Sequence, residues 1–154
     1  MSANFIAHII LWLLGFFFFS HIPVCKNGKS KNTSRPSVSI LVPARNEERN
    51  IPNLLSSLKS QIKADDEIIV VDDHSEDKTA AVAEQEGAKV IKSKQMPPGW
   101  TGKIWACYQG AQSAIGRILI FLDADTVIED GGLDDIISSY GKTYGVLSIQ
   151  PYHR

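Results

Sequence analysis

The sequence is poor in cysteine and lacks the glycine motifs that bind phosphates in two large classes of nucleotide-binding protein. Its two cysteines, Cys25 and Cys107, lie far apart and match neither a CxxC pair nor a zinc spacing, which suits a reducing compartment. No GxxxxGK[ST] sequence is present, because the GWTGKI segment offers no such phosphate cradle, and this disfavours a P-loop nucleotide hydrolase. The GxGxxG fingerprint of dinucleotide-binding domains is also absent.

Basic residues are scarce where a folded domain is expected. Lys26, Lys29, Lys31 and Arg35 precede the first acidic residue, so residues 36–154 hold 12 of the 16 basic residues against all 17 acidic ones, a balance of −5. Such a domain offers no basic surface for nucleic acid, and we expect no nucleic-acid partner. Its acidic excess is compatible with a site for a metal ion and a sugar.

Formal charge is missing altogether from FIAHIILWLLGFFFFSHI, residues 5–22. This run is long enough to cross a hydrocarbon core of roughly 30 Å, and we predict a transmembrane anchor over residues 1–24. Lysines follow the run and none precedes it, so the positive-inside rule predicts a single pass in the cell membrane with the rest of the chain on the cytoplasmic side. Residues 25–36 read as a basic flexible linker. A cleaved signal peptide is the alternative interpretation of the run.

Apolar strands alternate with amphipathic helices in the rest of the chain. Strands are predicted over residues 37–42, 67–71, 88–92, 118–122 and 145–150, and helices over residues 46–61, 77–88, 103–116 and 132–141. This alternation is typical of βαβ units, so we predict an α/β domain over residues 37–154, with a Rossmann-like, mostly parallel sheet and helices on both faces.

Polar clusters follow three of these strands: PARNEE after the first, DDHSED after the second and DADTVIED after the fourth. One cluster alone is better explained by helix caps and turns. The run Ile118 to Leu122 predicts a buried strand, so Asp123 and Asp125 leave the core together at its carboxyl end, where open α/β sheets bind ligands. Convergence of three clusters at one sheet edge therefore predicts a binding site.

The spacing of the acids suggests the chemistry of this site. Carboxylates at positions i and i+2, Asp123 and Asp125, can share one Mg²⁺ or Mn²⁺, with Asp125 as the direct ligand, and the cation can neutralise a diphosphate leaving group. Asp73 can accept a hydrogen bond from a base or ribose, and Lys103 can meet a phosphate as a point charge. Together these residues predict a site for a nucleotide diphosphate.

Four ordered segments, SILVPARNEERNI, IIVVDDHSEDKTA, GKIWACYQGA and ILIFLDADT, resemble the signatures of family 2 glycosyltransferases with the GT-A fold. The resemblance runs from about residue 37 to residue 153. It implies transfer of a sugar from a nucleotide donor, commonly a UDP-sugar, with Mg²⁺ or Mn²⁺ at the DxD acids. The positions that it implies as site residues are Pro43, Arg45, Asn46 and Glu47 beside the uridine, Asp73 at the base, Lys103 near the diphosphate, and Asp123 with the catalytic Asp125 as the DxD pair.

The segment MPPGWTGKIWACYQGA, with SIQPYHR at the end, is similar to the membrane-bound members that glucosylate carotenoid acids or accompany hopanoid synthesis. This similarity implies glucose transfer from UDP-glucose to a lipid-type acceptor such as a carotenoid acid. Trp100 and Trp105 line the donor or acceptor in this interpretation, although Trp105 fits a core position equally well. Because no catalytic base is visible before Arg154, we expect the chain to act as the donor-binding half of such an enzyme.

Two other classes stay open at this stage. EIIVVDDHS also resembles the acidic pair of a response-regulator receiver, with Asp123 as its phosphoacceptor, but this leaves SVSILVPARNEE unexplained. A non-catalytic, membrane-tethered nucleotide-binding module is the other alternative. Calorimetry with UDP and Mn²⁺, and then with a phosphoryl mimic and Mg²⁺, separates a nucleotide-sugar binder from a receiver.

Overall fold

The structure, a computed structural model, describes residues 8–9, 12, 35–141 and 145–149. Most of the predicted anchor and linker therefore lie outside the described residues. Within the part that is described, no helix has the length and the apolar character needed to cross a bilayer. The membrane anchor and its orientation stay predictions.

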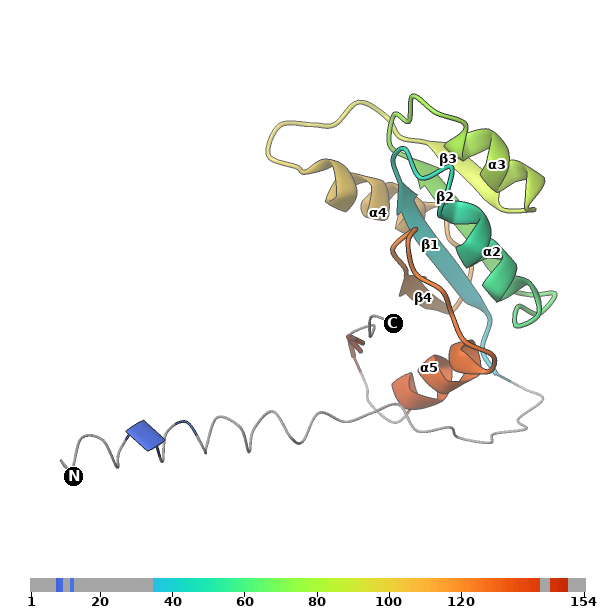
Figure 1. Cartoon of the computed structure of the whole chain (residues 1–154), viewed down its shortest axis with the longest axis vertical. Helices are drawn as coiled ribbons and strands as arrows, with labels where there is room; N and C mark the ends of the chain where they lie inside the picture. The colour runs from blue at the N-terminus through green and yellow to red at the C-terminus, as the bar shows by residue number, and fades with distance from the viewer. Residues whose placement is uncertain (1–7, 10–11, 13–34, 142–144, 150–154) are drawn as a thin grey trace.

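Four parallel strands form one sheet in the order β3-β2-β1-β4 (Figure 1). The strands are β1 (Val38–Ala44), β2 (Glu67–Asp72), β3 (Lys89–Lys92) and β4 (Ile118–Phe121), and the helices are α2 (Ile51–Lys59), α3 (Thr79–Gln85), α4 (Gly102–Gln112) and α5 (Gly132–Tyr140). The predicted parallel α/β fold is confirmed. The strand predicted over residues 145–150 is wrong for residues 145–149, which form no strand, and residue 150 is not among the described residues.

Helices cover both faces of the sheet, as predicted, with α2 and α3 on one side and α4 on the other (Figure 1). Alternation along β1 explains this arrangement, because successive side chains of a strand point to opposite faces. Ile40 and Val42 pack in the same core cluster as Leu54 and Leu58 of α2. Leu41 instead packs in a second cluster with Ala106 of α4. β1 is therefore buried on both sides and forms the centre of the domain.

The order of the strands creates a switch point beside β1. The chain moves outward from β1 to β2 and β3, then returns through α4 to place β4 on the other side of β1. At such a point the connections from neighbouring strands diverge at the carboxyl ends, and this divergence opens a crevice for ligands. The sequence places its acidic clusters at these carboxyl ends.

The expectation that residues 118–122 form a buried strand is wrong for half of the strand. Ile120 is buried, but Leu119 and Phe121 are 41% and 51% exposed. Phe121 lies in register with Leu41, so it faces the same side of the sheet as α4. Since α4 packs against β1 and β2, it leaves the outer strand β4 uncovered on that face.

The folded domain begins before β1. Of the predicted linker, residues 35 and 36 are described, and the Arg35 guanidinium donates hydrogen bonds to the Asp66 carboxylate at 2.6 and 3.1 Å and to the Gln61 carbonyl at 3.2 Å. The side chains of Arg35 and Asp66 are 7% and 1% exposed. The backbone N–H groups of Val38 and Lys63 also donate to Asp66, so this carboxylate ties the entry of β1 to the loop before β2.

Candidate functional site

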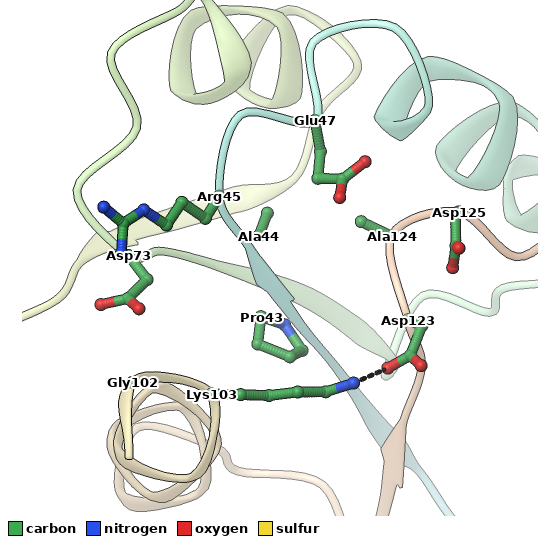
Figure 2. A pocket seen from close by; sticks show the side chains of 10 residues that line it. All are labelled: Pro43, Ala44, Arg45, Glu47, Asp73, Gly102, Lys103, Asp123, Ala124 and Asp125. Carbon is green, nitrogen blue, oxygen red and sulfur yellow. Dashed lines mark ion pairs between the residues drawn. The ribbon is translucent and has the colours of Figure 1, made fainter.

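A cavity of about 460 Å³ lies at the carboxyl edge of the sheet, at the switch point between β1 and β4 (Figure 2). Its lining comes from the end of β1, the loop after β2, the start of α4 and the loop after β4: Pro43, Ala44, Arg45, Glu47, Asp73, Gly102, Lys103, Asp123, Ala124 and Asp125. The predicted convergence of the polar clusters is confirmed. Every predicted site residue except Asn46 lines this cavity.

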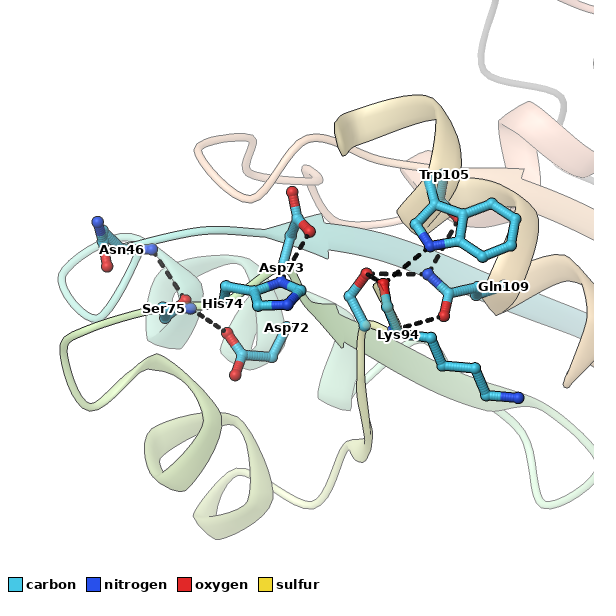
Figure 3. Close-up of polar contacts among 9 residues, drawn as sticks. Asn46, Asp72, Asp73, His74, Ser75, Lys94, Trp105 and Gln109 are labelled. Atoms are coloured by element: carbon cyan, nitrogen blue, oxygen red, sulfur yellow. Dashed lines mark hydrogen bonds and ion pairs between the residues drawn. The ribbon is translucent and has the colours of Figure 1, made fainter. Parts of the chain in front are cut away.

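Asn46 connects two loops that support the site. Its backbone is in the left-handed region, with a φ of 57°, and its N–H donates to the Ser75 hydroxyl at 3.0 Å (Figure 3). Its side-chain oxygen accepts a hydrogen bond from the Glu76 N–H at 2.8 Å. The Ser75 N–H in turn donates to the Asp72 carboxylate at 3.1 Å. These bonds fasten the loop after β1 to the loop after β2, and the predicted contact of Asn46 with uridine stays a prediction.

Lys103 and Asp123 form an ion pair across the cavity, with 2.7 Å between Nζ and the carboxylate oxygen (Figure 2). The hydrogen bond to Asp123 raises the pKa of Lys103, so the ammonium group stays charged at neutral pH. Both side chains are more than half exposed, and exposed ion pairs of this kind stabilise a fold by only about 0–1 kcal/mol. The pair can therefore open at little cost when a ligand offers either group a stronger partner.

The acids of the cavity suit a divalent cation that is bound together with phosphate. Asp123 and Asp125 offer carboxylate oxygens, which are the ligands that Mg²⁺ and Mn²⁺ prefer. Among the described residues there is no group of three or more His, Cys, Asp or Glu side chains that could hold a metal alone. Mg²⁺ is commonly held by one or two carboxylates plus substrate phosphates and water, so the residues fit a cation that arrives with a diphosphate.

Gly102 is a site residue that the sequence reasoning missed. A Cβ atom at this position would lie 2.6 Å from the Asp73 carboxylate oxygen, which is closer than carbon and oxygen approach without bonding. Glycine therefore allows the first turn of α4 to touch the loop after β2. The available signal was a glycine directly before Lys103 at the start of the helix.

Buried Gln109 fixes the loop that leads into α4. Its side-chain oxygen accepts from the Lys94 N–H at 2.8 Å, and its amide nitrogen donates to the Ser93 hydroxyl at 2.9 Å (Figure 3). The Trp105 indole N–H donates to the Lys94 carbonyl at 2.9 Å. Trp100 and Trp105 are absent from the cavity lining, and Trp105 is half-buried and outside both core clusters, so neither of the two roles predicted for Trp105 is confirmed. These bonds hold the start of α4, and with it Lys103, in place.

The sequence profile described as "Glycosyl transferase family 2" matches residues 39–154. The chain belongs to glycosyl transferase family 2. This family match favours the glycosyltransferase interpretation over a receiver domain. Among curated proteins, the chain is 45% identical over 130 residues to the 4,4'-diaponeurosporenoate glycosyltransferase of Staphylococcus haemolyticus. It is 40% identical over 131 residues to the protein of the same name from Staphylococcus aureus strain USA300.

Both alignments cover 81% of this chain and 34% of the relative. The chain thus spans about a third of the length of the curated relatives that it matches.

Solved structures share the fold of this family 2 chain. Residues 1–349 of S. aureus TarS in complex with UDP-GlcNAc match with a TM-score of 0.58 and 29% identity, over 69% of this chain and 31% of that one. Glucosyl-3-phosphoglycerate synthase from Mycobacterium tuberculosis, in complex with Mn²⁺, UDP and glucosyl-3-phosphoglycerate, matches with a TM-score of 0.56 and 29% identity, over 64% and 37%. The domain is therefore an α/β domain of the GT-A type.

Proposed function

We propose that this chain binds a UDP-sugar and a divalent cation, as the donor-binding part of a glycosyltransferase that transfers glucose to a carotenoid acid. The observation that carries the proposal is the convergence of Asp73, Lys103, Asp123 and Asp125 on one cavity at the switch point of the sheet. The acceptor class is supported by the names of the relatives, which are 4,4'-diaponeurosporenoate glycosyltransferases. The donor class is supported by the neighbours whose structures contain UDP or UDP-GlcNAc.

Each polar residue of the cavity has a role in this proposal. Asp73 accepts a hydrogen bond from the N3–H of uracil, beside Pro43, Arg45 and Glu47. Lys103 leaves Asp123 and contacts the diphosphate, which carries more negative charge than one carboxylate. Asp125 would hold the divalent cation directly, and Asp123, once released from Lys103, would complete the pair of carboxylates.

The bound cation would neutralise the charge that develops on the UDP leaving group. The carboxylates of the cavity are themselves negative, so they cannot neutralise this charge without the cation. Lys103 contributes one positive charge near the same phosphates, because a lysine ammonium group is charged at neutral pH. Together the cation and Lys103 favour the separation of UDP from the sugar.

A single-pass anchor over residues 1–24, with the domain on the cytoplasmic side, belongs to the same proposal. It is supported by the uncharged residues 5–22 and by the lysines that follow them. A carboxyl-terminal reporter that is active only outside the cytoplasm should stay inactive when fused to this chain. An active reporter would reverse the proposed orientation.

Calorimetry on the full chain in detergent tests the donor site with two closely matched nucleotides. CDP has the size and charge of UDP, but its ring nitrogen N3 is an acceptor and would face the Asp73 carboxylate without a proton. Hydrogen bonds to charged groups contribute about 1.5–3 kcal/mol, so UDP should bind about 10- to 100-fold more tightly than CDP in the presence of Mn²⁺. Asp73→Asn should reduce this preference, because an amide can also donate to the cytosine nitrogen. UDP binding that is absent, or equal with and without the cation, would contradict the proposal.

A further inference from the structure

His74 has an uncommon backbone conformation beside the donor cavity. Its φ of 60° lies in the left-handed region, which residues other than glycine rarely adopt. Among the described residues, Asn46 is the only other non-glycine residue with a positive φ, and its side chain joins two loops of the site. Glycine would adopt this conformation at position 74 without steric cost. A histidine at this position therefore points to a role for its side chain.

The imidazole of His74 lies beside the Asp73 carboxylate, with 3.3 Å between Nδ1 and Oδ1 (Figure 3). Because an ionised carboxylate only accepts hydrogen bonds, Nδ1 must carry the proton in this contact. No other group in the described part of the chain donates a hydrogen bond to this carboxylate. Its second oxygen, Oδ2, lies against Gly102, where a Cβ atom would be only 2.6 Å away. The carboxylate is thus held between His74 and the first turn of α4.

The backbone around His74 is fixed by the ends of two neighbouring strands. The Asp73 N–H donates to the Ala44 carbonyl at the end of β1 at 2.8 Å. The Ser75 N–H donates to the carboxylate of Asp72, the last residue of β2, at 3.1 Å. The His74 side chain itself is 60% exposed, so its contact with Asp73 adds little to the stability of the fold. What the contact restrains is the direction of the Asp73 carboxylate.

We propose that His74 is a positioning residue that orients the Asp73 carboxylate and thereby sets the preference of the donor site for uracil. This inference rests on the proposed function, in which Asp73 accepts a hydrogen bond from the N3–H of uracil. An ionised carboxylate has about four lone-pair sites, so it can accept from His74 and from a base at the same time. A carboxylate that is already oriented also loses less freedom when the base binds.

Two substitutions at position 74 separate the role of the side chain from that of the backbone. His74→Gly keeps the left-handed conformation without strain and removes the donor. Asparagine also tolerates the left-handed region. Its amide nitrogen, like Nδ1 of histidine, is bonded to Cγ, so His74→Asn can donate to Asp73 from the same place. A residue that only shapes the turn would tolerate both substitutions equally, whereas a positioning residue would tolerate only asparagine.

Calorimetry on the full chain in detergent, with UDP and CDP in the presence of Mn²⁺, measures the preference. His74→Gly should weaken UDP binding about 2- to 13-fold, as expected for the loss of one hydrogen bond. It should not weaken CDP binding, because a less restrained carboxylate can turn away from the N3 acceptor of cytosine, so the preference for UDP should fall. His74→Asn should keep the preference. Equal losses in the two variants would overturn the proposal.

The tautomer of His74 tests the contact without any nucleotide. Nitrogen-15 NMR of the histidine side chains at about pH 9, where a free imidazole is neutral, reports which ring nitrogen carries the proton. The signal that disappears in His74→Asn is that of His74. We expect its proton on Nδ1 in the unsubstituted chain and on Nε2, the usual site in an unpaired imidazole, in Asp73→Ala. A proton on Nε2 in the unsubstituted chain would overturn the contact.

The binding data also distinguish a failure of this inference from a failure of the proposed function. UDP that does not bind the unsubstituted chain would overturn the proposed function and the uracil preference with it. UDP that binds the unsubstituted chain, and keeps its full preference over CDP in His74→Gly, would overturn only the role of His74. Thermal unfolding of both variants should be almost unchanged, since the contact is exposed.

Discussion

Gly102→Ala tests the closest contact in the candidate site. The added Cβ atom would lie 2.6 Å from the Asp73 carboxylate oxygen, so the Asp73 side chain must rotate or α4 must move. Asp73 is the residue that we expect to bind the base, and Gly102 directly precedes Lys103. A one-carbon change should therefore disturb both ends of the nucleotide site.

The expected loss of UDP affinity follows from the free-energy cost of moving the Asp73 carboxylate. Forcing a side chain about 30° away from its preferred rotamer costs about 0.5–1.5 kcal/mol. If binding of UDP needs the original rotamer, its dissociation constant should rise about 2- to 13-fold. Replacing glycine with alanine at a position that tolerates it stabilises a protein by about 0.4–1 kcal/mol, because the unfolded chain loses freedom. The two effects on folding nearly cancel, so the unfolding temperature should change little while UDP binding weakens.

Calorimetry with UDP and Mn²⁺, together with thermal unfolding, measures both quantities. Gly141→Ala is the matched control, since its Cβ atom would meet its nearest neighbours at an ordinary 3.6 Å and its φ of −62° suits alanine. This control should leave UDP affinity unchanged. Unchanged UDP affinity in Gly102→Ala as well would refute the reasoning, because Asp73 would then not need its observed position.

Three further predictions concern the acids of the domain. Asp125→Asn should weaken UDP binding in the presence of Mn²⁺ by about 10- to 100-fold in calorimetry. Asp130→Asn, on the same loop but outside the cavity lining, should leave UDP binding unchanged. Equal effects of the two substitutions would show that Asp125 is not a ligand of the metal. Asp66→Ala should lower the free energy of unfolding by about 1.5–3 kcal/mol in urea denaturation, because buried donors lose their charged acceptor while Arg35 keeps Asp134 as a partner at 3.0 Å. A loss below about 0.5 kcal/mol would contradict the burial of the Arg35–Asp66 pair. Burial alone would raise the pKa of Glu67, but hydrogen bonds lower it below its usual value. The ionised carboxylate therefore stabilises the fold at any pH above the usual pKa of a glutamate, and this stabilisation is lost as the pH falls through the lowered pKa. Glu67→Gln should therefore lower the unfolding temperature at neutral pH and have little effect in acid, and a larger effect in acid would refute this sign.

The sequence predicted the elements of the fold well because the apolar pattern records burial. The helical spacing of four apolar residues predicted α2, whose Ile51, Leu54, Leu55 and Leu58 are all buried. The pattern was less informative about position in the sheet. A run of five apolar residues predicted a buried β4, yet Leu119 and Phe121 are exposed, because the packing of α4 over β1 and β2 depends on contacts between distant segments.

The candidate site was predictable where chemistry depends on residue type, and less so where it depends on backbone position. The acids after three parallel strands were placed together by the topology alone. Asn46 belongs to the same motif as Arg45 and Glu47, but it forms hydrogen bonds with Ser75 and Glu76 in the neighbouring loop instead of lining the cavity. Gly102 carries no chemical group, so only the distance to Asp73 reveals its place in the site.

Anomalous X-ray diffraction from crystals of the chain grown with UDP and Mn²⁺ would test the central claim most directly. The claim is that one cavity at the switch point binds a nucleotide diphosphate together with a divalent cation. The result we predict is a manganese peak about 2 Å from an oxygen of Asp125, with UDP between Asp73 and Lys103 and with the Lys103–Asp123 ion pair opened. A manganese peak away from Asp125, or UDP bound outside this cavity, would contradict the account.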